Sequence, residues 1–409
     1  MREVRFEKLD KTSFQMVLEN GLKVIVAPMT KAKEVTLGVS VGKGLFLSET
    51  RIGNQEIFLG TASYLQEIIM KYHAKEADVL FSNEVKNTSS IKESYTNYSF
   101  TVGHKNYLDY ITPLLTLVDK FVVTNDEVEN FKSDYLAYSE KENAEINYQV
   151  RKNLYNDSPL KKDLFGNISS IKNIHLVSLR KFFNEYYDPS YLTLVITGNV
   201  KAEDIEKQVL NYLYTPHVKH EEIKVSKYFE DYLSVPCAED KSSSKDLTVA
   251  IKFNKREDLF NANGDKIFAL YETLPNVLFS TNNKSFVKNV PSVEKIVKSE
   301  FVEGGEDAFL MVSFKTNDKE ASKNEIEKYL SHPSKIISFF NINALKSEVL
   351  QAKKDRYVNN PSDYFNDIVK SLANGYFTLS IVESIRSFGF FKFNSFVKTV
   401  CSFKRIYIA

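Results

Sequence analysis

The chain has 409 residues, and its 54 Lys and Arg residues are balanced by 53 Asp and Glu residues. A net charge of +1 argues against a nucleic-acid-binding protein, which usually carries a basic excess, and against an acidic disordered tail. Hydrophobic residues make up 43% of the chain, enough to fill the cores of more than one domain. No run of about 18 apolar residues occurs, so we expect no membrane-spanning helix.

Cysteine and histidine are both scarce. The two cysteines, Cys237 and Cys401, are too few and too far apart for a disulfide framework or a cysteine metal site. No Ser-His-Asp arrangement and no glycine-rich nucleotide-binding motif is present. We expect the histidines to be ordinary surface, loop or turn residues, including the i, i+3 pair in a polar stretch. The six are His73, His104, His175, His217, His220 and His332.

The first half of the chain alternates between strand and helix patterns. Residues 21–28 and 33–41 are rich in β-branched residues, and the short connection between them predicts an antiparallel hairpin. Residues 191–197 are apolar almost throughout, which is typical of a strand buried on both faces. Apolar periodicity predicts a further strand at 94–102 and helices at 60–75, 107–121, 126–154, 176–187 and 202–213.

A polar stretch divides the chain. Residues 217–245 contain Pro236 and a Lys-Ser-Ser-Ser-Lys run, and they predict a linker between domains 1–216 and 246–409. Both halves end with an aromatic segment followed by an apolar strand, which indicates an internal duplication. We therefore expect an α+β fold with two homologous αβ domains, each a mostly antiparallel sheet flanked by helices. In the second half, strands are predicted at 247–253, 308–315 and 405–408, and helices at 266–274, 324–330 and 342–357.

Three segments resemble the pitrilysin/insulinase-type zinc peptidases, a family that includes the mitochondrial processing peptidases. Residues 20–26 resemble the family's opening strand. Residues 60–71, with the sequence GTASYLQEIIMK, are similar to a family helix with the pattern G-x-A-H-F-L-E-H-M-L-F-K. Residues 158–200 resemble the family's P-L-x-x-x-x-x-G, F-Y-x-x-x-Y-x-P and V-x-V-V-G-D-V patterns in order and spacing. The resemblance is weaker in the C-terminal half.

The resemblance implies a zinc site, but the residues for it are missing. In the family, two histidines at i and i+4 bind zinc and the glutamate between them activates a metal-bound water. The matching positions here are Ser63, Gln66 and Glu67. A serine is a poor ligand, Gln66 cannot accept a proton, and one carboxylate does not hold zinc. We therefore expect no catalytic residue, no metal and no cofactor in this degenerate, inactive member. The family's third ligand would fall among Asp134, Glu140, Glu142 and Glu145.

The resembled family contacts its substrate in two ways, one through side chains and one through the backbone of a strand. Family members hold substrate with an Arg and a Tyr from the C-terminal half, and the corresponding residues 278–297 contain neither. They also pair an extended peptide with the strand that follows the zinc helix. Here the matching stretch is Asn87, Thr88, Ser89 and Ser90. Pairing of this kind needs only backbone groups, so it can survive loss of the catalytic side chains. The alternative interpretation is a covered sheet edge.

The resemblance also implies a partner. Family enzymes enclose peptides in a clam-shell of four homologous αβ domains, and a chain with two such domains is half of it. We expect a non-catalytic subunit of a bacterial two-subunit pair, bound to a homologous subunit that carries the zinc. A peptide is the expected substrate, with a bacteriocin or other ribosomally made precursor as a candidate by analogy. The balanced charge and few cysteines predict a cytoplasmic protein.

Two alternatives remain open at the level of sequence. One is an active metallopeptidase that uses Glu67 and a carboxylate from residues 134–145. The other is a purely structural scaffold subunit. Zinc content separates the first alternative from the expected function. A genomic neighbour that encodes an H-x-x-E-H homologue would favour the expected function over the second alternative.

Overall fold

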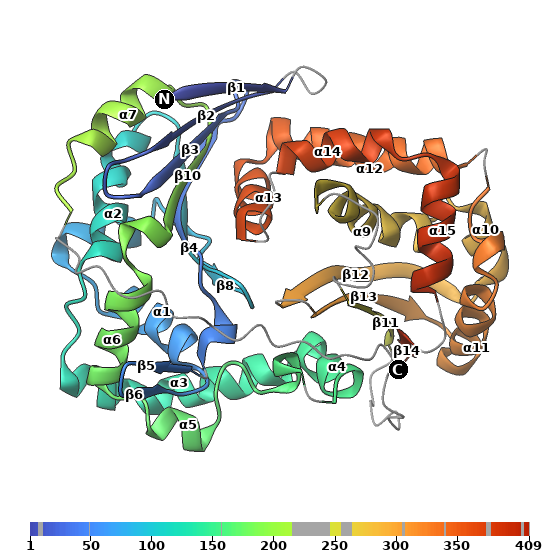
Figure 1. Ribbon diagram of the computed structural model, residues 1–409, viewed down its shortest axis with the longest axis horizontal. Coiled ribbons are helices and arrows are strands. Elements are labelled where there is room, and N and C mark those ends of the chain that lie inside the picture. Colours follow the sequence, from blue (N-terminus) through green and yellow to red (C-terminus); the bar gives the residue numbers. More distant parts are fainter. Residues whose placement is uncertain are drawn as a thin grey trace. The chain divides into compact units, whose positions relative to one another are not determined.

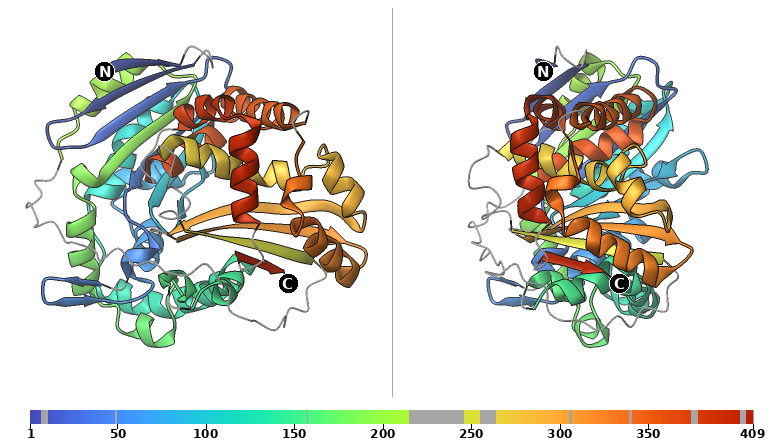
Figure 2. Two further views of the ribbon diagram at one scale, coloured as in Figure 1. Left: turned by 45° about the vertical axis from the view of Figure 1, so that its right-hand side comes forward. Right: turned by 90° about the vertical axis from the view of Figure 1, so that its right-hand side faces the viewer.

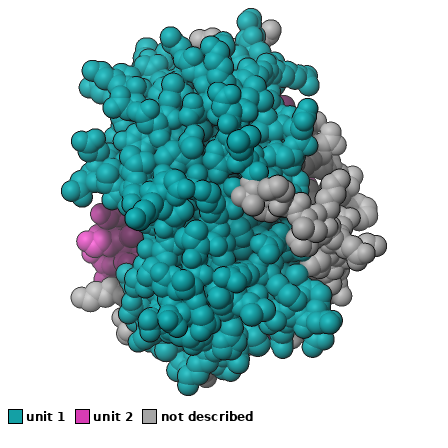
Figure 3. Space-filling view, turned by 90° about the vertical axis from the view of Figure 1, so that its left-hand side faces the viewer, with its two compact units in different colours: residues 1–144, 163–226, 354–378 teal, residues 145–162, 227–353, 379–409 magenta. Residues whose placement is uncertain are grey.

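The computed structural model describes residues 1–6, 11–48, 50–156, 158–214, 246–254, 264–304, 307–338, 341–373, 378–401 and 405–408. The chain forms two compact units, which Figure 3 shows in different colours. Unit 1 comprises residues 1–144, 163–226 and 354–378, and unit 2 comprises residues 145–162, 227–353 and 379–409. The predicted linker, with His217, His220 and Cys237, lies outside the described residues. The predicted domain boundaries at 216 and 246 therefore stay a prediction.

Unit 1 is built around an eight-stranded sheet (Figure 1). The strand order is β1-β2-β3-β10-β4-β9-β7, and β8 also pairs with β9. Only β10 and β3 run parallel, and the other neighbours are antiparallel. The strands are β1 (Arg2–Phe6), β2 (Lys11–Val17), β3 (Lys23–Pro28), β4 (Glu34–Val41), β7 (Lys86–Asn87), β8 (Ser90–Ile91), β9 (Thr96–Gly103) and β10 (Leu192–Gly198). A separate hairpin joins β5 (Thr50–Ile52) to β6 (Gln55–Ile57).

The predicted hairpin between residues 21–28 and 33–41 is wrong. Both strands form, as β3 and β4, but β10 lies between them in the sheet. All but one residue of β10 are buried, so this apolar strand occupies the centre of the sheet. The connection between β3 and β4 crosses the end of β10, where the Met29 N–H donates to Gly198 O at 2.6 Å. A local pattern cannot show that a strand from much later in the chain separates two consecutive ones.

Helices cover both faces of this sheet. In Figures 1 and 2, α2 and α13 lie on opposite faces of it, and α13 contacts β10 and β4. The predicted helix 126–154 is two helices, because Glu145 has an extended backbone (ψ 144°). The helices of unit 1 are α1 (Thr61–Lys71), α2 (Ile111–Asp119), α3 (Asn125–Ala144), α5 (Ile168–Lys172), α6 (Leu176–Tyr186), α7 (Ala202–Leu210) and α13 (Pro361–Ala373), with the longer 3₁₀ segment η3 (Lys75–Phe81).

Unit 2 contains an antiparallel sheet of order β12-β13-β11-β14. Its strands are β11 (Asp246–Asn254), β12 (Val293–Gly304), β13 (Asp307–Thr316) and β14 (Ile406–Ile408). Its helices are α4 (Ile146–Leu154), α9 (Gly264–Phe279), α10 (Lys284–Asn289), α11 (Lys319–Leu330), α14 (Thr378–Ser387) and α15 (Phe390–Val400), and α12 (Ile342–Asn359) begins here and ends in unit 1.

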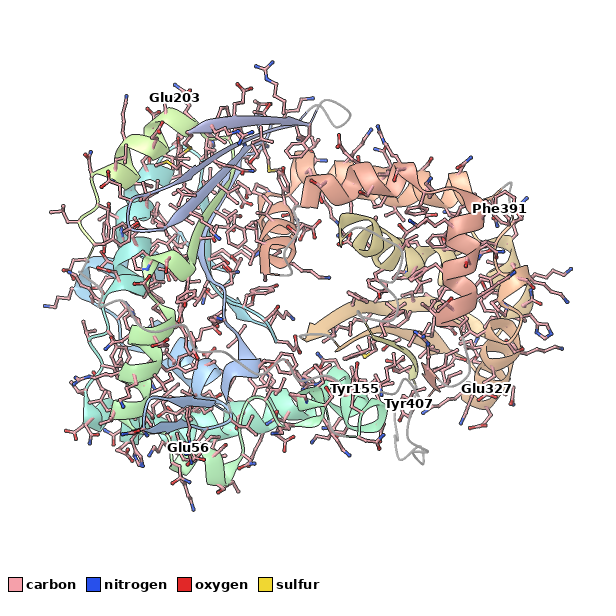
Figure 4. All side chains as sticks on the ribbon, in the orientation of Figure 1. Glu56, Tyr155, Glu203, Glu327, Phe391 and Tyr407 are labelled. Carbon is pink, nitrogen blue, oxygen red and sulfur yellow. The ribbon has the colours of Figure 1, made fainter. Side chains whose placement is uncertain are left out.

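Helix α4 belongs to unit 2 because polar contacts hold its end to the sheet (Figure 4). The Tyr155 hydroxyl donates to Ala308 O at 3.0 Å, and the Lys252 ammonium donates to Leu154 O at 3.1 Å. The Asn153 amide donates to the Tyr407 hydroxyl at 3.1 Å.

Both units are mixed helix-and-sheet structures with largely antiparallel sheets, which confirms the predicted α+β class. In the part of the chain that the structure describes, no helix has the length and apolar character needed to cross a membrane.

Candidate functional site

Helix α1 carries the three residues that match the zinc motif. It begins after Gly60, whose φ of 87° is in the left-handed region that favours glycine. A Cβ at this position would lie 2.6 Å from Phe165 O, so no other residue fits there without a shift of the backbone. The start of α1 is therefore fixed against the loop at Phe165, and with it the positions of Ser63, Gln66 and Glu67.

Ser63 is fully buried against tyrosines of α3. Its exposed fraction is 0%. The hydroxyls of Tyr135 and Tyr138 lie close enough to hydrogen-bond with its Oγ, and this contact opposes the rise in pKa that burial causes in each tyrosine. Tyr135 is itself fixed, because its hydroxyl donates to Phe165 O at 2.9 Å and approaches Gly60 O at 3.3 Å. Aromatic side chains thus surround the position that holds a metal ligand in the resembled motif.

Gln66 acts as a hydrogen-bond donor inside the fold. It is 2% exposed, and its Nε2 donates to the backbone oxygen of Asn97 in β9 at 3.1 Å. The Asn97 side chain continues this polar chain by donating to Ser99 Oγ at 3.1 Å. An ionised glutamate at position 66 could not make the first of these bonds, because a carboxylate has no donor. The residue that replaces the general base therefore ties α1 to the sheet.

Glu67 is half-buried, and its carboxylate makes no hydrogen bond or ion pair with any described residue. Burial raises its pKa above the ordinary value, and the negative charge of Glu142 raises it further. The Glu67 carboxylate interacts electrostatically with four side chains from two elements. These are Tyr98 of β9 and Tyr135, Tyr138 and Glu142 of α3.

The structure selects Glu142 among the four carboxylates that the sequence left as candidates. Glu142 is half-buried and interacts with Glu67, whereas Glu140 and Glu145 are exposed. Asp134 pairs instead with Lys71, with 2.9 Å between Oδ2 and Nζ. The sequence could not make this choice, because all four residues lie on or beside the same charged helix.

The residues present do not fit a zinc ion. Zinc sites in proteins use four ligands, mostly nitrogen and sulfur. Among the described residues, no group of three His, Cys, Asp or Glu side chains could hold a metal ion. The nearest histidine in sequence, His73, is engaged elsewhere, because its Nε2 lies 3.2 Å from Asp78 and its ring stacks on Phe81. That the chain works without a cofactor stays a prediction.

The predicted peptide-binding stretch lies at the edge of the unit 1 sheet. Asn87 ends β7 and Ser90 begins β8, and both strands pair with β9. Between them, the Thr88 N–H donates to Ser99 O at 2.8 Å, and Ser89 Oγ accepts from the Ser99 N–H at 3.0 Å. The four residues therefore form one irregular edge strand. Whether it binds a peptide stays a prediction.

This edge strand and α1 meet in one place. Ser89 Oγ lies 4.0 Å from Sδ of Met70, one turn after Glu67 on α1. Gln66 donates to Asn97, the residue opposite Ser90 in the β8–β9 pair. The structure thus brings the degenerate motif and the predicted peptide edge together. Residues 278–297 belong to unit 2, where the Asn283 amide donates to Val277 O at 2.6 Å and closes the turn after α9.

The tyrosines that surround Ser63 were not predicted from the sequence. Their signal is the i, i+3 spacing of Tyr135 and Tyr138 on a helix whose other side is highly charged. An open groove of about 490 Å³ was also unexpected, and it lies apart from the degenerate motif, between the β5–β6 hairpin (Glu56 in Figure 4) and α5. It is lined by Arg51, Glu56, Ile57, Phe58, Leu59, Asn167, Ser169, Ser170 and Asn173.

Comparisons with known proteins find similarity to one peptidase family. The model of the peptidase M16 inactive domain matches residues 173–324. An uncharacterized zinc protease of Bacillus subtilis, YmfH, is 24% identical over 242 residues, which are 55% of this chain and 56% of that protein. The matched segments span about half the length of the curated relatives, with 56%, 42% and 43% covered in the first three.

Solved structures share the fold along the whole chain. A putative M16-like peptidase from Alicyclobacillus acidocaldarius superimposes with a TM-score of 0.79 at 14% identity, over 99% of this chain and 98% of that one. The periplasmic protease PqqL of Escherichia coli superimposes with a TM-score of 0.69 at 11% identity, over 100% of this chain but 48% of PqqL. This chain therefore has the fold of nearly the whole of the first chain and of about half of the second.

Proposed function

This chain belongs to the peptidase M16 family, and we propose that it is a non-catalytic member that pairs with a zinc-bearing homologue and binds peptide for it. The proposal rests on the three residues of α1 that match the zinc motif. Serine, glutamine and glutamate stand where the motif needs two histidines and a glutamate, and Gln66 and Ser63 are buried in contacts that stabilise the fold. The helix therefore lacks the two histidines that bind zinc in the motif and the glutamate that activates the metal-bound water.

Pairing is supported by the extent of the fold. The chain corresponds to 48% of PqqL, so a second, homologous half is needed to reach the size of that protein. We propose that the second half is a separate chain with two histidines on its own α1 equivalent, and that zinc binds only there. The cytoplasm is the proposed location of the pair, as expected from balanced charge and few cysteines.

Peptide binding is supported by the edge strand beside α1. Its N–H and C=O groups on the side away from β9 can pair with an extended segment, which needs no particular side chain. The proposed ligand is a peptide precursor, with bacteriocin-type precursors as the finer form of the proposal.

Co-purification tests the proposal. The chain and an H-x-x-E-H homologue from the same genome are expressed together, and the zinc content of each subunit and the cleavage of a fluorogenic peptide library are measured. We expect a one-to-one complex that cleaves, with less than one-tenth of an equivalent of zinc on this chain. Cleavage should persist when Glu67 is replaced by Gln here, and stop when the partner's motif glutamate is replaced.

The second candidate function is an active metallopeptidase that uses Glu67 with Glu142, favoured only by the proximity of these two carboxylates. Stoichiometric zinc on the isolated chain, with cleavage that Glu67→Gln abolishes, would establish it in place of the first. A complex that cleaves equally well with an Asn87→Pro edge variant would instead make this subunit a scaffold.

A further inference from the structure

We infer that the N-terminal half of the chain, residues 1–216, and the C-terminal half, residues 246–409, bind each other by an exchange of helices and stay associated when the chain between them is cut. Helix α4 comes from the N-terminal half and belongs to unit 2, whereas α13 comes from the C-terminal half and belongs to unit 1. Each half is therefore a binding partner of the other. This inference is independent of the proposed function, because it concerns how the chain is held together and not what it binds.

The first observation is the docking of α13 on the unit 1 sheet, where it contacts β10 and β4. Phe365 of α13 is 0% exposed. Strand β4 has room for this ring because Gly38 has no side chain, and a Cβ there would lie 2.5 Å from Cζ of Phe365. At the start of α13, the buried Thr197 hydroxyl of β10 donates to Pro361 O at 2.7 Å. The N-terminal half thus supplies a surface that fits an aromatic helix of the C-terminal half.

The second observation is the docking of α4 on the unit 2 sheet. Leu154 and Tyr155, at the end of α4, are both 0% exposed. The Lys252 ammonium of β11 lies 3.1 Å from Leu154 O and 4.6 Å from the centre of the Tyr155 ring. The Tyr155 hydroxyl donates to Ala308 O of β13. Buried polar groups are costly to leave without their partners, so both bonds oppose the withdrawal of α4 from this sheet.

The two exchanges are reciprocal, and each helix is tied to the opposite unit by the chain before it. Helix α4 follows α3 of unit 1, and α13 follows α12, which begins in unit 2. Separation of the halves must therefore withdraw α4 from unit 2 and α13 from unit 1. Both steps expose apolar side chains that are buried in the intact chain, which is unfavourable in water. A cut between residues 216 and 246 removes none of these contacts.

Cleavage of the full chain tests the inference. A protease recognition sequence is inserted into the predicted linker, residues 217–245, and the purified protein is cut to completion. We expect the two halves to elute together in size-exclusion chromatography and to keep the circular dichroism spectrum of the uncut protein. Separation of the halves in native buffer would overturn the inference.

Two matched variants show whether the exchanged helix holds the halves together. Phe365→Leu shortens a buried side chain that packs against the other half. Phe314→Leu shortens a side chain that is also 0% exposed, but its ring contacts with Phe279 and Phe286 lie within its own half. Both changes remove volume from a core, so both should lower the stability of the uncut protein.

The readout is the rate at which the cut halves dissociate, measured by their exchange with an isotopically labelled copy. Phe365→Leu should raise this rate about tenfold, and Phe314→Leu should raise it less than about twofold. An equal increase in both variants would show that release of the halves follows general unfolding and not the withdrawal of α13, and it would overturn the inference.

Discussion

Restoring the missing general base is expected to destabilise the fold instead of restoring activity. In Gln66→Glu, the carboxylate replaces an amide of nearly the same shape. The amide Nε2 donates to Asn97 O at 3.1 Å, and the side chain is 2% exposed. An ionised carboxylate at this position has no proton to donate and faces the carbonyl oxygen instead.

The magnitude follows from two contributions. Loss of the hydrogen bond costs about 1 kcal/mol, and burial of a polar group without its partner adds about 1 to 3 kcal/mol. A total of about 2 to 4 kcal/mol at pH 7 corresponds to a folded-state pKa about 1.5 to 3 units above that of a free glutamate. The folded state then binds the proton more tightly than the unfolded state. The stability is therefore kept below about pH 4 and lost as the pH rises through about 6 to 7.

Urea denaturation followed by circular dichroism at pH 4.5 and pH 7.5 measures this effect, since the chain has no tryptophan. Gln66→Met is the control, because it removes the donor without adding a charge and should lose about 1 kcal/mol at both pH values. If Gln66→Glu is within about 0.5 kcal/mol of the wild type at pH 7.5, water reaches this side chain, and its role as a buried tie between α1 and β9 is refuted.

Three further changes probe the same region. Glu67→Gln should raise the free energy of unfolding at pH 7 relative to the wild type, because the raised pKa of Glu67 makes its ionised form unfavourable in the fold. The gain should vanish in acid, where the native carboxyl is protonated, and a difference in urea midpoints that does not depend on pH would contradict this. Tyr135→Phe should lower the free energy of unfolding by about 1 to 2 kcal/mol through loss of the bond to Phe165 O, and an unchanged melting temperature would argue against that bond. Gly60→Ala should cost about 2 kcal/mol or more from its left-handed backbone and the contact with Phe165 O, whereas Gly103→Ala, where a Cβ meets nothing within 4 Å, should be nearly neutral.

Sequence patterns predicted the parts of the fold that depend on local periodicity. The helix with Ser63, Gln66 and Glu67 and the buried strand at 191–197 both form where the pattern placed them. The pairing of strands could not be predicted this way, because the position of β10 between β3 and β4 depends on contacts between distant segments. For the same reason, no local signal showed that α13 packs on the unit 1 sheet.

The candidate site was likewise predictable only in part from the sequence. A motif comparison is enough to find a missing ligand, so Ser63 and Glu67 stood out at once. The surroundings of these positions depend on three-dimensional packing. The sequence alone therefore shows neither that tyrosines surround Ser63 nor that Glu142, among the four candidate carboxylates, interacts with Glu67. The polar bond of Gln66 likewise needed the sheet to be in place.

The side chain of Asn87 accepts a hydrogen bond from a backbone N–H of the edge strand that an incoming strand would also use. Its Oδ1 accepts the N–H of Ser89 at 2.8 Å, and this N–H belongs to the row that points away from β9, since the Thr88 N–H points toward it. Any incoming strand must displace this bond first, at about 1 kcal/mol, or about fivefold in affinity. Sheet edges without such a cover pair readily with unrelated chains. Asn87 therefore lowers the affinity of any strand that pairs with this edge, whichever chain it comes from.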